Sequence, residues 1–179
     1  MQAVWPSYDG SMRASVLIGI VAILAVGLAA TRQLAAWSPP SASVAHRYTP
    51  TLNGYLASRY THAEGVFGRD GQWYCATKLL GVQSDGSDVT AYAWTLCEET
   101  THSQGRIKTG SAYSLPVVVH LRRQGGHLRG VGYAAPADAP AYTSDVHRLF
   151  PSNIANWILS HPSAELGPLG REVRAEASR

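Results

Sequence analysis

The sequence contains little cysteine and little charge. Its two cysteines in 179 residues are too few for a disulfide-dense scaffold or a four-cysteine zinc site. Charged residues account for 15% of the chain and the mean hydropathy is -0.09, a composition too apolar for a chain that is disordered throughout. The formal net charge of +3 is small, and we expect no nucleic-acid partner.

Motifs that hold a phosphate, a metal or an activated nucleophile are also missing. The sequence has no G-x-S-x-G elbow and no P-loop. Its seven histidines never lie two, three or four residues apart, the spacings that place two ligands on one element. Gly65, Gly68 and Gly71 precede the first predicted strand, which indicates a turn-rich loop. The sequence therefore predicts no metal, no cofactor and no catalytic residue, and it favours a non-enzymatic protein.

One apolar run, Ala14–Ala30, could cross a membrane, and it is the only such run. As a helix it would span about 25 Å, slightly less than a hydrocarbon core of about 30 Å, with Trp37 at the interface. The alternative is a cleaved signal peptide with the small-x-small pattern Gly27-Leu28-Ala29. Both interpretations place the C-terminal part outside the cytoplasm, in a single-pass membrane protein or, after cleavage, in a secreted one.

The remaining chain divides by composition. The segment SPPSAS is rich in proline and serine and carries no charge, which is typical of an extended linker. The predicted divisions are a short N-terminal tail (1–13), a transmembrane helix or signal sequence (14–31), a Pro/Ser linker (32–50), an extracytoplasmic domain (51–168) and a flexible charged tail (169–179).

Two aromatic-rich runs flank SDGSD, and Asp85-Gly86 is a strong hairpin signal. Partners across an antiparallel hairpin have residue numbers with a constant sum, and a turn centred near Gly86 places Cys75 opposite Cys97. We therefore predict a Cys75–Cys97 disulfide and an oxidising compartment. One face of this hairpin is expected to pack against helices, through Tyr74, Ala76, Leu80, Tyr92, Trp94 and Leu96.

Two further strands, 114–122 and 127–133, are separated by Gln124-Gly125-Gly126. A helix with Leu52, Tyr55 and Leu56 on one side, starting after Pro50 with Thr51 as its cap, precedes the strands, and two short helices around Pro151 follow them. The predicted fold is α+β, with one four-stranded antiparallel sheet and helices packed on one face. The element order is similar to that of cystatin-like and nuclear-transport-factor-like cones.

Several segments follow a common pattern. They are an aromatic-x-Cys start (Trp73–Cys75), a Trp-containing strand (Tyr92–Glu99), a Pro-Val-Val segment (Gly110–Val119), a Pro-x-Asp loop (Pro136–Val146) and Leu149–Pro151. Together they resemble uncharacterised exported or membrane-anchored proteins of Gram-positive bacteria. This chain has Asp138-Ala139 where that pattern has Asp-Gly. The resemblance implies an extracytoplasmic location and no particular activity.

Basic side chains gather in the predicted hairpin at 122–129: Arg122, Arg123, His127 and Arg129. Such charges can attract an anionic envelope polymer, and they can equally protect a solvated sheet edge from pairing. The loop 134–142 could carry Asp138 and Tyr142 to a pocket near His120 and Asp145, or it could simply connect two elements.

The leading hypothesis is a membrane-anchored extracytoplasmic accessory domain that binds an envelope protein or an anionic envelope polymer. The alternative is a small-ligand-binding or hydrolytic cone-like domain with a pocket between sheet and helices, which requires His120, Asp138, Tyr142 and Asp145 to converge.

Overall fold

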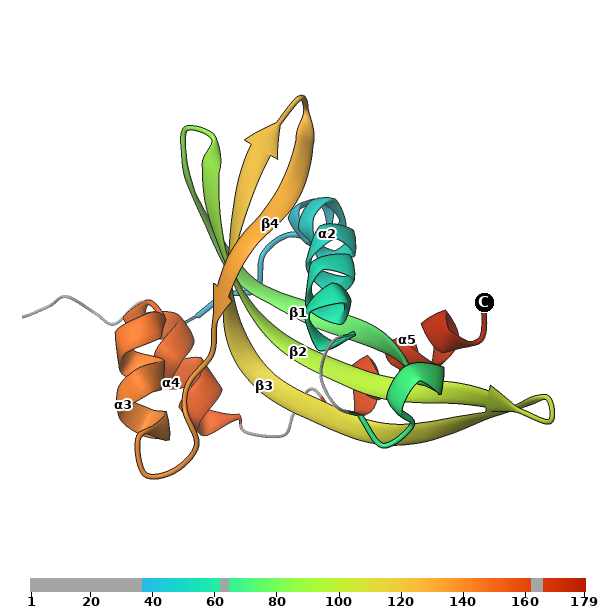
Figure 1. Ribbon diagram of the computed structural model, residues 1–179. Helices are drawn as coiled ribbons and strands as arrows, with labels where there is room; N and C mark the ends of the chain where they lie inside the picture. Colours follow the sequence, from blue (N-terminus) through green and yellow to red (C-terminus); the bar gives the residue numbers. More distant parts are fainter. Residues whose placement is uncertain (1–36, 62–64, 162–165) are drawn as a thin grey trace, which may run out of the picture. The chain divides into compact units, whose positions relative to one another are not determined.

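The computed structural model describes residues 37–61, 65–161 and 166–179, all within the second of two compact units, 36–179 (Figure 1). Here one helix precedes a four-stranded antiparallel sheet and three helices follow it, which confirms the predicted α+β class. The elements are α2 (Ala42–Tyr60), the 3-10 turn η1 (Gly68–Asp70), β1 (Gln72–Asp85), β2 (Asp88–Ser103), β3 (Arg106–Gln124), β4 (His127–Ala134), α3 (Tyr142–Leu149), α4 (Ser152–Ser160) and α5 (Leu166–Ala177).

None of the helices in the described ranges is both long and apolar enough to span a bilayer. The predicted membrane segment, Ala14–Ala30, lies outside the described residues.

The sheet is a meander in the order β1-β2-β3-β4, and each connection is a two-residue turn. Glycine with positive φ occurs in every turn, at Gly86, Gly105 and Gly125-Gly126, where tight hairpins require this conformation. The sequence predicted the first and third turns and missed the second, Gln104-Gly105. As a result β3 starts at Arg106, well before the predicted Ser114.

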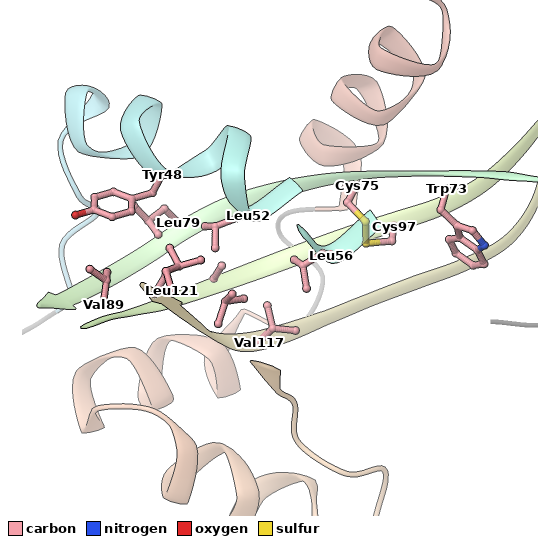
Figure 2. Close-up of a cluster of buried hydrophobic side chains, with 13 residues drawn as sticks. Tyr48, Leu52, Leu56, Trp73, Cys75, Leu79, Val89, Cys97, Val117 and Leu121 are labelled. Carbon is pink, nitrogen blue, oxygen red and sulfur yellow. A yellow bond between two sulfur atoms is a disulfide. The ribbon is translucent and has the colours of Figure 1, made fainter. Parts of the chain in front are cut away.

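Helices cover both faces of the sheet, and the expectation of one covered face was wrong (Figure 1). One face packs against α2 through Leu52 and Leu56 (Figure 2), and the other packs against α3, α4 and α5. The reason is that β2 carries apolar side chains on both faces of the sheet, and each face has to be shielded from water. The predicted helix-packed hairpin face is confirmed: Ala76, Leu80, Tyr92, Trp94 and Leu96 are buried there, and Tyr74 is half-buried.

Helix α2 begins at Ala42, inside the range predicted as a linker, rather than at Thr51. Pro50 lies within the helix, although proline removes one helical hydrogen bond. The burial of Tyr48, Leu52 and Leu56, spaced by four residues, stabilises the helix on both sides of this proline. The proline-serine composition was therefore a misleading signal from residue 42 onward.

Helix α5 occupies most of the segment predicted as a loose charged tail. Leu169, Val173 and Ala177 recur every fourth residue and are buried against the sheet, while the charged residues face solvent. Pro168 belongs to the first turn of the helix, where a missing N–H costs nothing.

Trp37 packs onto the domain, in contrast to its predicted place at a membrane interface. Its Nε1 donates a hydrogen bond to the carbonyl oxygen of Leu80 at 2.8 Å, and its ring lies 4.6 Å from that of Trp157. The Lys78 ammonium lies over the Trp157 ring at 4.8 Å, a cation–π contact. The chain is thus attached to the sheet five residues before α2 begins.

The predicted disulfide is confirmed, since Cys75 and Cys97 are register partners with an S–S bond of 2.02 Å (Figure 2). A β-bulge at Leu80, between the pairs Leu79–Ala93 and Gly81–Tyr92, shifts the register by one residue. The turn itself lies at Gly86-Ser87, and without the bulge Cys97 would oppose Ala76.

We expect the Cys75→Ser/Cys97→Ser variant to lose about 3 kcal/mol of unfolding free energy, because the bond closes a loop with a sequence separation of 22. Urea unfolding of both proteins measures the difference. Reductant should destabilise only the wild-type chain. Equal urea midpoints for wild type and variant in the absence of reductant would contradict the prediction.

Candidate functional site

A concave basic site lies between the N-terminal half of α2 and the β3–β4 turn. This basic groove has a volume of about 510 Å³. Among the described residues no acidic side chain lines it. Arg123 also donates from Nη2 to the Tyr48 hydroxyl at 3.0 Å, which orients its guanidinium. The lining residues are Arg47, Tyr48, Thr51, Arg123, Gly126, His127 and Leu128.

Two of the four predicted basic residues, Arg123 and His127, line the basic groove. His127 is the first residue of β4 and reaches the groove from beside the turn, although strand alternation places it on the hairpin face opposite Arg123. Arg122 pairs with Arg129, and the next pair along the ladder is Arg123 with Leu128. Because successive side chains in a strand point to opposite faces, Arg122 and Arg129 lie on the face opposite Arg123 and Leu128. Arg122 forms an exposed ion pair with Asp88 at 2.9 Å. Arg47 was missed, because it lies in a segment that the sequence analysis took for a linker.

A cluster of near-parallel aromatic rings occupies the other end of α2. Tyr60, Trp73 and Tyr113 have ring centroids 5.1 to 5.5 Å apart and interplanar angles of 14° to 29°. Burial raises the pKa of Tyr60 above 10.0, and the neighbouring Tyr133 and Tyr113 raise it further. The Arg59 guanidinium lies over the Tyr133 ring at 5.8 Å. We call Tyr60, Trp73, Tyr113 and Tyr133 the aromatic platform.

The residues of the alternative, hydrolytic hypothesis do not share a cavity. None of the five cavities described in the structure is lined by His120, Asp138, Tyr142 or Asp145. His120 and Asp138 are exposed, and burial raises the pKa of the half-buried Tyr142. The structure therefore supplies no catalytic constellation from this set.

Asp145, which the alternative hypothesis placed in a pocket, has a structural role at the end of the loop that precedes α3. Its Oδ2 accepts a hydrogen bond from the Ala137 N–H at 3.0 Å, and its Oδ1 accepts one from Arg148 Nη2 at 2.8 Å. These bonds hold the Asp145 pKa below its ordinary 3.8, the Ala137 bond being the larger cause. The carboxylate thus closes the 137–145 loop onto the first turn of α3.

The carboxyl of Asp145 should titrate below 3.8 in an NMR pH titration, and Arg148→Gln should move its pKa only part of the way back. A carboxyl group whose pKa is lowered by folding stabilises the fold at pH values above its ordinary pKa. This stabilisation is lost as the pH falls through the folded-state pKa. Asp145→Asn should therefore be less stable than wild type at pH 7, with the difference vanishing in acid. Arg171→Gln on α5 serves as the control, and an Asp145 pKa at or above 3.8 would refute the assignment.

Glu99 is a fully buried carboxylate that the sequence analysis did not single out. Its Oε2 accepts a hydrogen bond from the N–H of Val66 at 2.7 Å and another from that of Ser111 at 3.3 Å, while its Oε1 accepts one from Phe67 at 3.0 Å. The doublet Glu98-Glu99 at the end of an apolar strand was the available signal, since a buried charge requires such partners.

Glycines make room for this carboxylate. A Cβ at Gly65, Gly71 or Gly110 would lie 2.0, 2.2 or 2.7 Å from an oxygen of Glu99. Three glycines and three main-chain donors enclose both oxygens, so no substrate reaches them. We assign Glu99 to the attachment of the 65–71 loop to β2 and β3, not to catalysis.

Glu99→Gln should lower the free energy of unfolding by about 1–3 kcal/mol, because an amide NH2 cannot accept the loop hydrogen bonds and leaves a buried N–H unpaired. Hydrogen exchange at the Val66 and Phe67 amides should accelerate more than exchange in β3. The exposed Glu172→Gln is the matched control and should change stability by less than about 0.5 kcal/mol. Unchanged protection of both amides would show that Glu99 does not hold the loop.

No group of three or more potential metal ligands occurs in the described part of the chain. A further cavity of about 600 Å³ lies beside the 65–71 loop and is lined mainly by mixed polar residues, among them Asp70, Thr100 and Lys108. Its lining combines both charge signs and selects no single class of ligand.

No protein-family model matches the chain, and no curated protein and no solved structure matches it either.

Proposed function

We propose that this protein is a non-enzymatic extracytoplasmic accessory domain that binds an anionic polymer of the cell envelope through the basic groove. The observation that carries the proposal is the convergence of Arg47, Arg123 and His127 from separate elements on one concavity without an acidic neighbour among the described residues. An acid-free basic concavity attracts anions and raises their local concentration.

Location is part of the same proposal. The Cys75–Cys97 disulfide is consistent with an oxidising compartment. The apolar run Ala14–Ala30 would supply a membrane anchor, or a signal sequence if it is cleaved, as in the Gram-positive exported proteins that the chain resembles. The order of one helix followed by a four-stranded meander agrees with a cystatin-like arrangement, an analogy that concerns architecture alone.

Binding of fluorescent dextran sulfate to the full-length protein, followed by anisotropy, tests the proposal. The Arg47→Gln/Arg123→Gln/His127→Gln variant should bind at least about tenfold more weakly, since one hydrogen bond from a charged group contributes about 1.5 kcal/mol or more. Raising the salt concentration should weaken wild-type binding, because salt screens exposed charges.

Arg129→Gln is the matched control, as Arg129 lies in the same hairpin, on the face opposite Arg123, and does not line the groove. If this control loses as much affinity as the triple variant, net charge and not the groove explains the binding, and the role of the groove is overturned. Salt-independent binding, or crosslinking to an envelope protein without any polymer binding, would overturn the polymer itself.

A further inference from the structure

The basic groove and the aromatic platform lie on one continuous face, formed by α2 and β4. Leu128 lines the basic groove together with Arg47 and Thr51 at one end. In the middle, Tyr55 lies on Gly130, where a Cβ would approach the ring to 2.2 Å. At the other end, Arg59 lies over Tyr133. Figure 1 shows α2 beside β4 along this face.

The length of this face suits a polymer. From Arg47 to Tyr60 the helical rise gives about 20 Å. A single phosphate or carboxylate would occupy only the basic end, whereas a linear chain can contact both ends at once. Once one end of a chain is bound, the second contact forms within the same complex and does not incur the entropy cost of a new association. Even modest contacts at each end therefore favour a polymer.

Two tyrosines of the platform, Tyr113 and Tyr133, are partly exposed to solvent. Trp73 is only 6% exposed and supports the cluster from below, while Tyr113 and Tyr133 are 42% and 37% exposed. In the described part of the chain neither of these two hydroxyls is hydrogen-bonded to a protein group. A tyrosine ring offers an apolar face for stacking and a hydroxyl for hydrogen bonding. A sugar ring has the matching chemistry, with C–H groups on its faces and hydroxyls around its edge.

We propose that the α2–β4 face binds a linear polysaccharide whose repeating unit combines a sugar ring with an anionic group. The sugar rings stack on Tyr113 and Tyr133, and the anionic groups pair with Arg47, Arg123 and His127. The inference rests on the proposed function for the basic end and adds the ring-stacking end, which selects a polysaccharide among anionic polymers.

Three polymers separate the contributions of charge and ring in calorimetric titrations of the full-length protein. Polygalacturonate carries rings and carboxylates, dextran carries rings without charge, and polyphosphate carries charge without rings. We expect polygalacturonate to bind at least about tenfold more tightly than polyphosphate, and dextran to bind most weakly.

The Tyr113→Ala/Tyr133→Ala variant should lose about tenfold in affinity for polygalacturonate and keep its affinity for polyphosphate. The Tyr113→Phe/Tyr133→Phe variant keeps the rings and should retain most of the affinity, which separates stacking from loss of structure. Val131→Ala removes an exposed apolar side chain from the same strand and should have no effect. Thermal unfolding of each variant checks that the fold is intact.

The outcomes distinguish the two proposals. If the tyrosine variants bind polygalacturonate normally while the triple basic variant fails, the basic groove stands and the polysaccharide inference is wrong. If the alanine and phenylalanine variants lose affinity equally, hydroxyl contacts and not ring stacking are responsible, which also overturns it. If polygalacturonate binding ignores the basic substitutions, both the proposed function and the inference fail.

Discussion

The constraint on which the structure depends is the burial of β2 on both faces. Every residue from Ala91 to Thr100 is buried, so neither side of this strand can face water. The protein meets this demand with α2 on one face and with α3, α4 and α5 on the other. The need for a second cover explains why a charged, proline-containing C-terminal segment forms a helix: Leu169 and Val173 are required over the sheet.

The register between β1 and β2 determines which residues the disulfide joins. Leu80 bulges out of the ladder, which aligns Cys75 with Cys97 and leaves the Leu80 carbonyl to accept the Trp37 indole N–H. One irregularity therefore sets the disulfide partner and the point where the chain joins the domain. In the pairing of β2 with β3, Glu99 lies between the paired residues Glu98 and Thr100 at a second irregularity, and its carboxylate binds the 65–71 loop. Bulges in long strands allow such local departures without disrupting the ladder on either side.

Sequence patterns predicted what depends on neighbouring residues. The Asp85-Gly86 turn signal and the alternation around Tyr92 and Trp94 were sufficient for the first hairpin and its helix-packed face, and the glycines at 125 and 126 marked the last turn. The disulfide prediction placed the turn centre at Gly86 and succeeded because the bulge at Leu80, which no local pattern predicted, offsets the true turn position by one residue. Failures came where tertiary contacts override local preference. Pro50 is tolerated because residues before and after it are buried, and no local pattern reports that burial. The sequence could not assign Arg47 to the basic site, because only the docking of α2 brings it to Arg123.

The same docking also explains why a candidate binding face exists. Gly130 lacks the Cβ that would collide with the Tyr55 ring, so the middle of α2 approaches β4 closely. On one side lies the basic groove at Arg123 and on the other the Tyr133 end of the aromatic platform. Two separate surface features, one on each side of a close contact, suit a ligand with separated recognition points. The packing that shields the sheet therefore also creates the groove and displays the rings, so the surface needs no lid or domain closure to form and its ordering cost on binding is small.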